Sequence, residues 1–355
     1  MSRSIMVTGA AGFIGANFVH YWAQQYPEDR IVAYDALTYA GNVANLEGLL
    51  ERDNFHFVHA DICDYQRVLG TMGEHAVDTV VHFAAESHVD RSITGPDAFI
   101  ETNVTGTHTL LKAAREMWLG GEKQVPHRFH HVSTDEVYGS LSTDAPGFYE
   151  EQKYEPNSPY SASKAASDHL VRAYHHTYGL QVTTSNCSNN YGPFHFPEKL
   201  VPLCLTNILR GLPLPVYGDG SNIRDWLYVA DHCRGIELVL QDGRVGETYN
   251  IGGNNEWNNL AIVELLCTQL DARFADDPAL AGRFPDSPCA KGGSARDLIT
   301  FVEDRAGHDW RYAIDATKIT SELGYVPAES FETGLAKTLD WYLANESWWR
   351  PLLIN

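Results

Sequence analysis

The apolar positions along the first part of the chain follow two alternating periodicities. Short apolar runs of strand length are separated by longer segments in which apolar residues recur at helical spacing. The runs predict strands at Ile5–Val7, Ile31–Tyr34, Phe55–Val58, Thr79–Phe83 and Phe129–Val132. Strands that alternate with helices in this way build a parallel sheet with helices on both faces.

The same pattern predicts two long helices and a change of architecture after them. One helix runs from about Asp97 to Met117 and the other from Pro159 to Tyr178, with Ser158 as its N-cap. Beyond them proline and glycine become frequent, so a smaller and less regular lobe is expected there.

The chain therefore divides into two interleaved parts. We expect residues 1–188 to form the main α/β domain, to which the chain returns around 225–251. Residues 189–224 and 252–355 are assigned to the smaller α/β lobe. The segment 275–296 is rich in Asp, Pro, Gly and Ala, which predicts a surface loop.

Charge and cysteine usage exclude several classes of protein. A formal net charge of −20 without any basic stretch argues against nucleic acid or an anionic membrane as a partner. The six cysteines and sixteen histidines lack zinc-ligand spacing, so we expect no metal site and reduced thiols. With neither a signal-peptide pattern nor an apolar run of membrane-spanning length, a cytoplasmic protein is expected.

Three glycines, Gly9, Gly12 and Gly15, follow the first strand and open a helix. Such a loop lets the backbone approach a pyrophosphate, whose charge rests on the helix N-terminus. Asp35 ends the next strand, where a carboxylate accepts hydrogen bonds from ribose hydroxyls and repels a 2′-phosphate. The chain is therefore expected to bind NAD rather than NADP, with Asp61-Ile62 beside the adenine.

Tyr160 and Lys164 lie four residues apart and share one helix face. The ammonium is expected to lower the phenol pKa and make Tyr160 a base for alcohol oxidation. Tyr149 and Lys153 have the same spacing, but acidic neighbours would raise the pKa of Tyr149, so we assign the role to Tyr160. With the glycine spacing, this pair resembles the extended short-chain dehydrogenase/reductase superfamily.

Thr134-Asp135-Glu136 follows a strand, so its side chains are expected at the carboxyl edge of the sheet. Alone, this tripeptide is equally typical of a helix N-terminus, where carboxylates interact with the helix dipole. Beside Tyr160 and Lys164 it indicates an acid and a base, because adjacent carboxylates in an apolar pocket do not both ionise easily.

A more specific resemblance extends over nearly the whole chain. The dTDP-glucose 4,6-dehydratase family is similar at Ala84–Ser92, Ser133–Gly139, Pro159–Lys164, Asn186–Pro193, Phe196–Leu200, Ile223–Trp226 and Asp304–Asp315. Ala306 and Trp310 depart from the family, which usually has Pro and Arg there. The resemblance implies a Rossmann-type doubly wound parallel sheet with a smaller, interleaved substrate-binding lobe.

It also implies the chemistry. Tyr160, with Lys164 and the Thr134 hydroxyl, would take the proton of the glucose 4-hydroxyl while hydride passes to a tightly bound NAD. Glu136 would remove the C5 proton, and Asp135 would protonate the departing C6 hydroxyl. Hydride then returns to C6 and leaves a 4-keto-6-deoxy sugar. The resemblance thus implies a hydro-lyase.

The resemblance assigns binding residues in the same way and implies a homodimer through the two long helices. The cofactor would contact Gly9, Gly12, Phe13, Ile14, Gly15, Asp35, Thr38, Asp61, Ile62, Phe83, Ala84, Ala85, Ser87, Thr102, Tyr160, Lys164 and Asn190. The nucleotide-sugar substrate would contact Ser87, Thr134, Asn189, Lys199, Leu200, Pro215, Tyr217, Arg224, Asn259, Arg305 and His308.

Other functions stay open at this point. A UDP-glucose 4,6-dehydratase has a similar Ser133–Gly139 segment. A nucleotide-sugar 4-epimerase or decarboxylase also oxidises C4, but has no use for Asp135 and Glu136 as an acid–base pair. A non-catalytic NAD-binding regulator has no reason to keep Tyr160 and Lys164.

Overall fold

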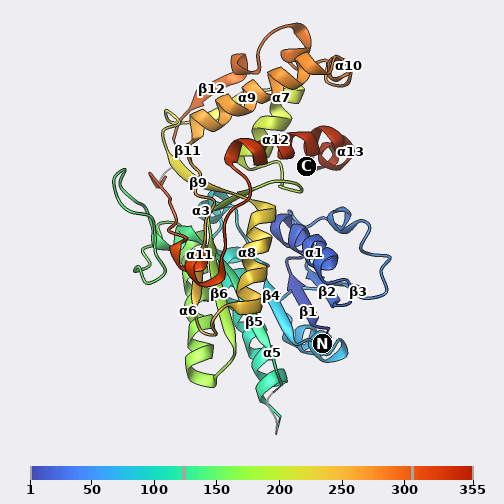
Figure 1. Cartoon of the computed structure of the whole chain (residues 1–355), viewed down its shortest axis with the longest axis vertical. Coiled ribbons are helices and arrows are strands. Elements are labelled where there is room, and N and C mark those ends of the chain that lie inside the picture. Colours follow the sequence, from blue (N-terminus) through green and yellow to red (C-terminus); the bar gives the residue numbers. More distant parts are fainter. Residues whose placement is uncertain (1, 122–124, 305–307, 354–355) are drawn as a thin grey trace.

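The computed structural model describes residues 2–121, 125–304 and 308–353. At its centre is a seven-stranded parallel sheet with the order β10-β6-β5-β4-β1-β2-β3 (Figure 1). Its strands are β1 (Ser4–Thr8), β2 (Arg30–Asp35), β3 (Phe55–His59), β4 (Thr79–His82), β5 (Arg128–Thr134), β6 (Val182–Cys187) and β10 (Thr248–Ile251). The five strands expected from the apolar runs are all present, and the α/β fold is confirmed.

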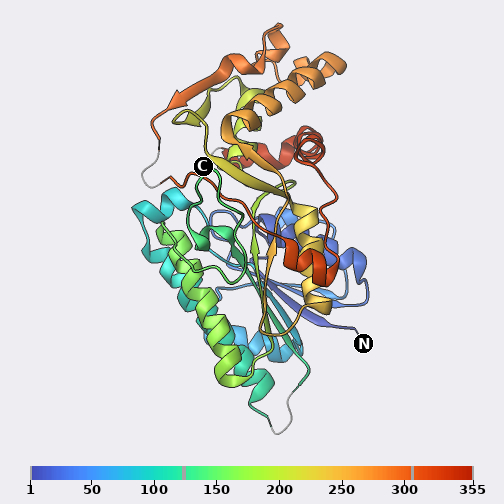
Figure 2. The same ribbon diagram turned by 60° about the vertical axis from the view of Figure 1, so that its left-hand side comes forward.

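Helices cover both faces of this sheet. One face carries α1 (Phe13–Gln25), α8 (Val229–Asp242) and α11 (Thr317–Leu323). The other carries α2 (Tyr65–Glu74), α5 (Thr107–Leu119) and α6 (Pro159–Tyr178), of which α5 and α6 lie side by side (Figure 2). The bounds of α6 are those expected, because Ser158 and Ser161 form a capping box and Gly179 adopts a left-handed C-cap.

The first of the two expected long helices is not a regular α-helix throughout. After α3 (Val89–Thr94), the chain forms α4 (Asp97–Phe99), a π-helix at Ile100–Gly106 and then α5. Within the π-helical turn, Asn103 is buried, and Thr107 Oγ1 donates to its carbonyl at 2.6 Å. A π-turn inside a helix rotates the side chains that follow it, and such turns are frequent at functional sites.

The smaller lobe surrounds a separate apolar core. Its helices are α7 (Leu200–Arg210), α9 (Asn259–Asp276), α10 (Ala279–Arg283), α12 (Phe331–Ala344) and α13 (Glu346–Trp349). Two short sheets complete the rest of the fold: β7 (Asn189–Tyr191), β9 (Ile223–Tyr228) and β11 (Glu256–Asn258) form one, and β8 (Leu214–Tyr217) and β12 (Ile299–Val302) form the other.

Two segments differ from the expectation. The stretch 275–296 is not a simple surface loop, since α10 lies in it and Leu280 and Phe284 are buried. Residues 314–325 were expected in the smaller lobe, but Ile314, Ile319 and Tyr325 belong to the core under α1 and α8. In both cases the apolar contacts come from residues distant in sequence.

Two further observations concern the chemical environment of the chain. In the three described ranges, no helix is both long enough and apolar enough to cross a membrane. The cysteines at 63, 187, 204, 233, 267 and 289 all lie in these ranges and are free thiols.

Candidate active site

A cavity of about 760 Å³ lies at the carboxyl ends of the central strands, with the smaller lobe as its opposite wall. Ligands of open α/β folds bind at this edge of the sheet. Every residue expected to contact the cofactor lines the cavity. Of those expected to contact the substrate, all described ones line it, while Arg305 lies outside the described residues, as does Ala306.

The glycine-rich loop is shaped for a close approach of backbone to a ligand. Gly9 has a φ of +68°, and a Cβ there would meet the Ala84 nitrogen at 2.7 Å. A Cβ on Gly15 would lie 2.1 Å from the Gly9 carbonyl oxygen, so the helix packs directly on the loop. Helix α1 begins at Phe13 without a side-chain cap, which leaves the N–H groups of its first turn available to an anion.

Asp35 is held rigidly at the end of β2. Its Oδ2 accepts from the Ala11 N–H at 2.8 Å and its Oδ1 accepts from the Leu37 N–H at 2.8 Å. Burial raises the pKa of Asp35, and the two backbone hydrogen bonds oppose that shift. This carboxylate lines the cavity, where a ribose diol fits.

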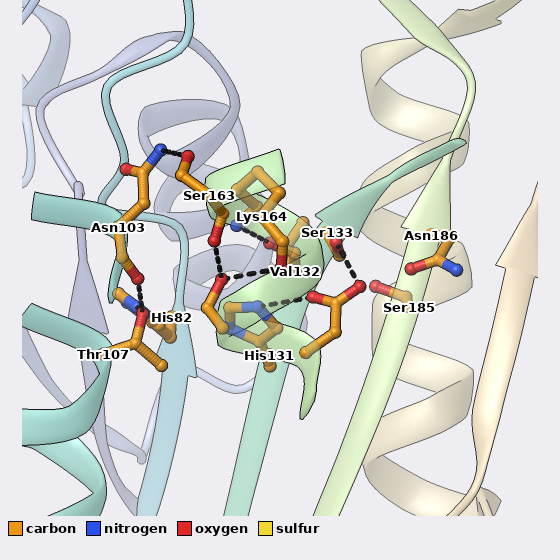
Figure 3. Close-up of polar contacts among 12 residues, drawn as sticks. His82, Asn103, Thr107, His131, Val132, Ser133, Ser163, Lys164, Ser185 and Asn186 are labelled. Carbon is orange, nitrogen blue, oxygen red and sulfur yellow. Dashed lines mark hydrogen bonds and ion pairs between the residues drawn. The ribbon is translucent and has the colours of Figure 1, made fainter. Parts of the chain in front are cut away.

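Tyr160 and Lys164 reach the cavity from the first turns of α6, and both are buried. The Lys164 ammonium donates to the Val132 carbonyl at 2.8 Å (Figure 3). The expected depression of the Tyr160 pKa is wrong for this structure: burial raises it well above its usual value and the Glu136 charge adds to the rise, while the Thr134 hydrogen bond opposes both. Tyr149, by contrast, is 49% exposed and does not line the cavity.

Thr134, Asp135 and Glu136 form the start of a short helix. They also bring a hydroxyl and two carboxyl groups close to the cavity. A 3-10 helix spans Asp135–Tyr138, and Thr134 caps it by accepting from the Glu136 N–H at 3.3 Å. Asp135 is buried behind the cavity wall, whereas Glu136 lines the cavity.

The environment of Asp135 favours its protonated form. Its Oδ1 accepts from the Thr134 hydroxyl at 3.3 Å, and its Oδ2 is buried without a partner among the described residues. Burial, followed by the charges of Glu136 and Asp225, raises the pKa of Asp135 well above its usual range. A neutral acid therefore lies beside a carboxylate that reaches the cavity.

The cations on the substrate side are held by backbone carbonyls. Arg224 donates to Ile223 at 2.7 Å, to Trp310 at 3.2 Å and to Asp309 at 2.8 Å. Its guanidinium lies 4.2 Å from the ring centre of Tyr312. These contacts fix the planar group at the cavity wall in a geometry suited to a diphosphate.

Several cavity residues escaped the sequence interpretation. Cys187 ends β6 directly opposite Thr134, and His195 stacks on Phe13 with ring centres 4.1 Å apart. No spacing rule marks either residue. Cys187 and Tyr312 could still have been found, because they lie in the strings Asn186–Pro193 and Arg311–Asp315 used for the resemblance.

Comparisons with known proteins agree with this geometry. The family model described as GDP-mannose 4,6 dehydratase matches residues 6–338. A dTDP-glucose 4,6-dehydratase from Salmonella typhimurium is 52% identical over 354 residues, covering 97% of this chain and 94% of the relative. This chain belongs to the dTDP-glucose 4,6-dehydratase family.

Solved structures place the chain within the same family. The family member DesIV from Streptomyces venezuelae, crystallised with NAD, has a TM-score of 0.87 and 48% identity, over 98% of this chain and 99% of that one. A UDP-glucose 4-epimerase from Thermotoga maritima, crystallised with UDP-glucose, has a TM-score of 0.81 at 26% identity, over 97% and 99% of the two chains. The fold is thus shared with epimerases, and the site residues must separate the two activities.

Proposed function

We propose that this chain is an NAD-dependent dTDP-glucose 4,6-dehydratase, which converts dTDP-glucose to dTDP-4-keto-6-deoxy-glucose. The observation that carries the proposal is the pair formed by buried, protonated Asp135 and cavity-lining Glu136, next to Tyr160 and Lys164. Alcohol oxidation alone needs a base of the Tyr160 kind. Removal of water needs an acid and a second base as well.

The residues present fit NAD. The uncapped start of α1 and the glycine loop are suited to the pyrophosphate, and Asp35 to the adenosine ribose. When bound, NAD supplies a hydride acceptor at C4 and the donor that returns the hydride to C6. Lys164 would hold the nicotinamide ribose from the floor of the cavity.

The side chains of this protein would move the protons. Tyr160 would take the proton from the 4-hydroxyl in its phenolate form as this carbon is oxidised, and the Thr134 hydrogen bond favours that form against the burial that raises the Tyr160 pKa. The new ketone acidifies C5–H, and Glu136 removes that proton. Asp135 then protonates the C6 hydroxyl, which leaves as water. Arg224, already fixed by three carbonyls, binds the diphosphate together with Lys199.

Alternative substrates and reactions are separated by one set of assays. Purified protein should convert dTDP-glucose to a product with the alkali-induced absorbance of a 4-keto sugar, and it should do so faster than with UDP-glucose. Faster turnover of UDP-glucose would make the protein a UDP-glucose 4,6-dehydratase. Formation of dTDP-galactose without a keto sugar would make it a 4-epimerase and overturn the dehydratase assignment.

The proposal includes a homodimer in the cytoplasm. The long, adjacent helices α5 and α6 present one continuous side of the molecule (Figure 2), and the free thiols fit a reducing compartment. Light scattering of the purified protein should give twice the chain mass of 39.6 kDa. A charge introduced on the exposed side of these helices, as in Ala173→Glu, should shift the mass towards the monomer.

A further inference from the structure

Lys164 carries its charge in a buried place. The residue is 4% exposed, and its ammonium donates to the Val132 carbonyl. A buried ammonium is unfavourable unless an opposite charge compensates it. Asp168 lies one helical turn further along α6, on the same helix face, and is also buried.

The Asp168 carboxylate is fixed by two neighbours on β5. Ser133 Oγ donates to its Oδ2 at 2.9 Å, and His131 Nε2 lies 3.0 Å from its Oδ1 (Figure 3). His131 is completely buried, and burial together with the charge of Lys164 lowers its pKa well below its usual value. The ring is therefore neutral, and its Nε2–H donates to the carboxylate.

The other groups that face Lys164 do not balance its charge. His82 on β4 is buried, and the ammonium adds to the fall of its pKa, so this ring is neutral like that of His131. Burial raises the pKa of Cys187 on β6 and keeps that thiol protonated. Burial lowers the pKa of Lys164 itself, and the charge of Asp168 is the largest influence that opposes the shift.

We propose that Asp168 is a positioning residue for the dehydratase reaction, acting as the buried counter-charge that keeps Lys164 protonated and aimed at the cavity. His131 and Ser133 hold the carboxylate in place. Asp168 does not line the cavity, so it acts through Lys164 rather than on the substrate. The inference rests on the proposed function, because that function gives Lys164 its task.

The first test is the pH dependence of NAD reduction by dTDP-glucose in a single turnover. In Asp168→Asn, Lys164 should lose its proton at lower pH, so the alkaline limb of the rate profile should move down by at least about one pH unit, which is tenfold in the protonation equilibrium. Asp168→Glu keeps the negative charge, so its alkaline limb should lie close to the wild-type position. An alkaline limb that stays in place in Asp168→Asn would overturn the proposal.

Asp29→Asn is the matched control for this test. Asp29 is another buried carboxylate with two donors, the Arg3 N–H at 2.7 Å and Trp22 Nε1 at 3.0 Å, but it precedes β2 at the opposite end of the sheet. Its substitution should lower thermal stability without moving the alkaline limb. Equal shifts in Asp29→Asn and Asp168→Asn would contradict a specific role for Asp168.

A second test needs no substrate, so it separates this inference from the proposed function. Lys164→Met, Asp168→Asn and the double variant form a thermal-unfolding cycle. Lys164→Met leaves a lone buried carboxyl group whose pKa, about 6 with Lys164 present, should rise further, so ionising this group at pH 8 costs stability. The double variant should therefore unfold at least about 2 °C above Lys164→Met at pH 8. Additive shifts of the two single variants would overturn the pairing.

Discussion

At the level of single residues, burial gives two adjacent acidic side chains different environments. Asp135 lies behind the cavity wall with its pKa raised well above the usual range, whereas Glu136 reaches the cavity. The backbone separates them because the 3-10 helix that starts at Asp135 directs consecutive side chains to different sides. The same turn that caps a helix thereby places a buried acidic side chain next to one that lines the cavity.

Glu136→Gln should separate oxidation from water loss. The amide cannot take the C5 proton, so formation of the 4-keto-6-deoxy product should fall by about 10²–10⁴-fold, the usual contribution of a positioned general base. Tyr160 remains, and NADH should therefore accumulate on addition of dTDP-glucose. Absorbance of NADH and solvent deuterium uptake at C5 measure the two steps. A variant unable to reduce NAD would show that the roles are divided differently.

Asp135→Asn should change how stability depends on pH. A folded-state pKa above the unfolded value means that Asp135 favours folding most at low pH, and that this contribution is lost as pH rises through its folded pKa. The neutral amide has no such dependence. Thermal unfolding without substrate should therefore show the variant gaining stability relative to the wild type between pH 5 and pH 8. A constant difference would mean that Asp135 titrates normally.

At the level of elements, the sequence predicted those features that depend on residues close together along the chain. The capping box at Ser158 and the left-handed Gly179 define both ends of α6 within the sequence itself. The π-turn at Ile100–Gly106 was not foreseen, because helical periodicity hardly changes over one inserted residue. Its cause is tertiary: Asn103 pairs with groups outside its own helix. The raised pKa of Tyr160 was missed for a similar reason, since burial outweighs any neighbour in sequence.

Asn103 joins two segments that border the cavity through hydrogen bonds to Glu86 and Ser163. Its Oδ1 accepts from the Glu86 N–H at 2.8 Å, and its Nδ2 donates to the Glu86 carbonyl at 3.0 Å and to Ser163 Oγ at 2.8 Å. Ser163 Oγ in turn donates to the Tyr160 carbonyl at 2.7 Å. Asn103 thus connects the loop after β4 to helix α6, which carries Tyr160.

Removal of this link should weaken both folding and catalysis. Asn103→Ala leaves the part-buried N–H and carbonyl of Glu86 without their partner and removes one hydrogen bond from Ser163 Oγ, which should lower the free energy of unfolding by about 1–3 kcal/mol in urea titrations. The KM for dTDP-glucose should change less than kcat, because the displaced group is Tyr160. Unfolding energies within about 0.5 kcal/mol of the wild type would show that water replaces the amide without loss.

At the level of the whole molecule, the cavity exists only because the chain crosses between lobes. Residues 314–325 return to the main core after the chain has built most of the smaller lobe, a path set by burial of Ile314 and Ile319 rather than by local pattern. The sequence therefore predicted the lining residues by resemblance, but not the crossing that brings Tyr312 under Arg224. Long-range packing of this kind has no local signature.

The two lobes are also joined across the cavity rim. Arg91 on α3 lies 3.8 Å from the ring centre of Tyr39, which follows β2, and its NH2 is 3.2 Å from Glu198 Oε2 in the segment leading into α7. All three elements border the cavity, and Tyr39 and Glu198 line it. We expect a contact at this rim to slow the release of NAD from the cavity.

Arg91→Ala should therefore release NAD faster while changing stability little. The arginine side chain is 51% exposed, so the ion pair contributes at most about 1 kcal/mol to folding. Loss of the cation–π contact, worth about 0.5–1 kcal/mol at an exposed site, should speed NAD release about two- to fivefold. Cofactor retained after gel filtration measures this. Arg273→Ala, which breaks the ion pair with Asp340 inside the smaller lobe, is the control and should retain NAD like the wild type. Equal retention in both variants would show that the rim contact does not hold the cofactor.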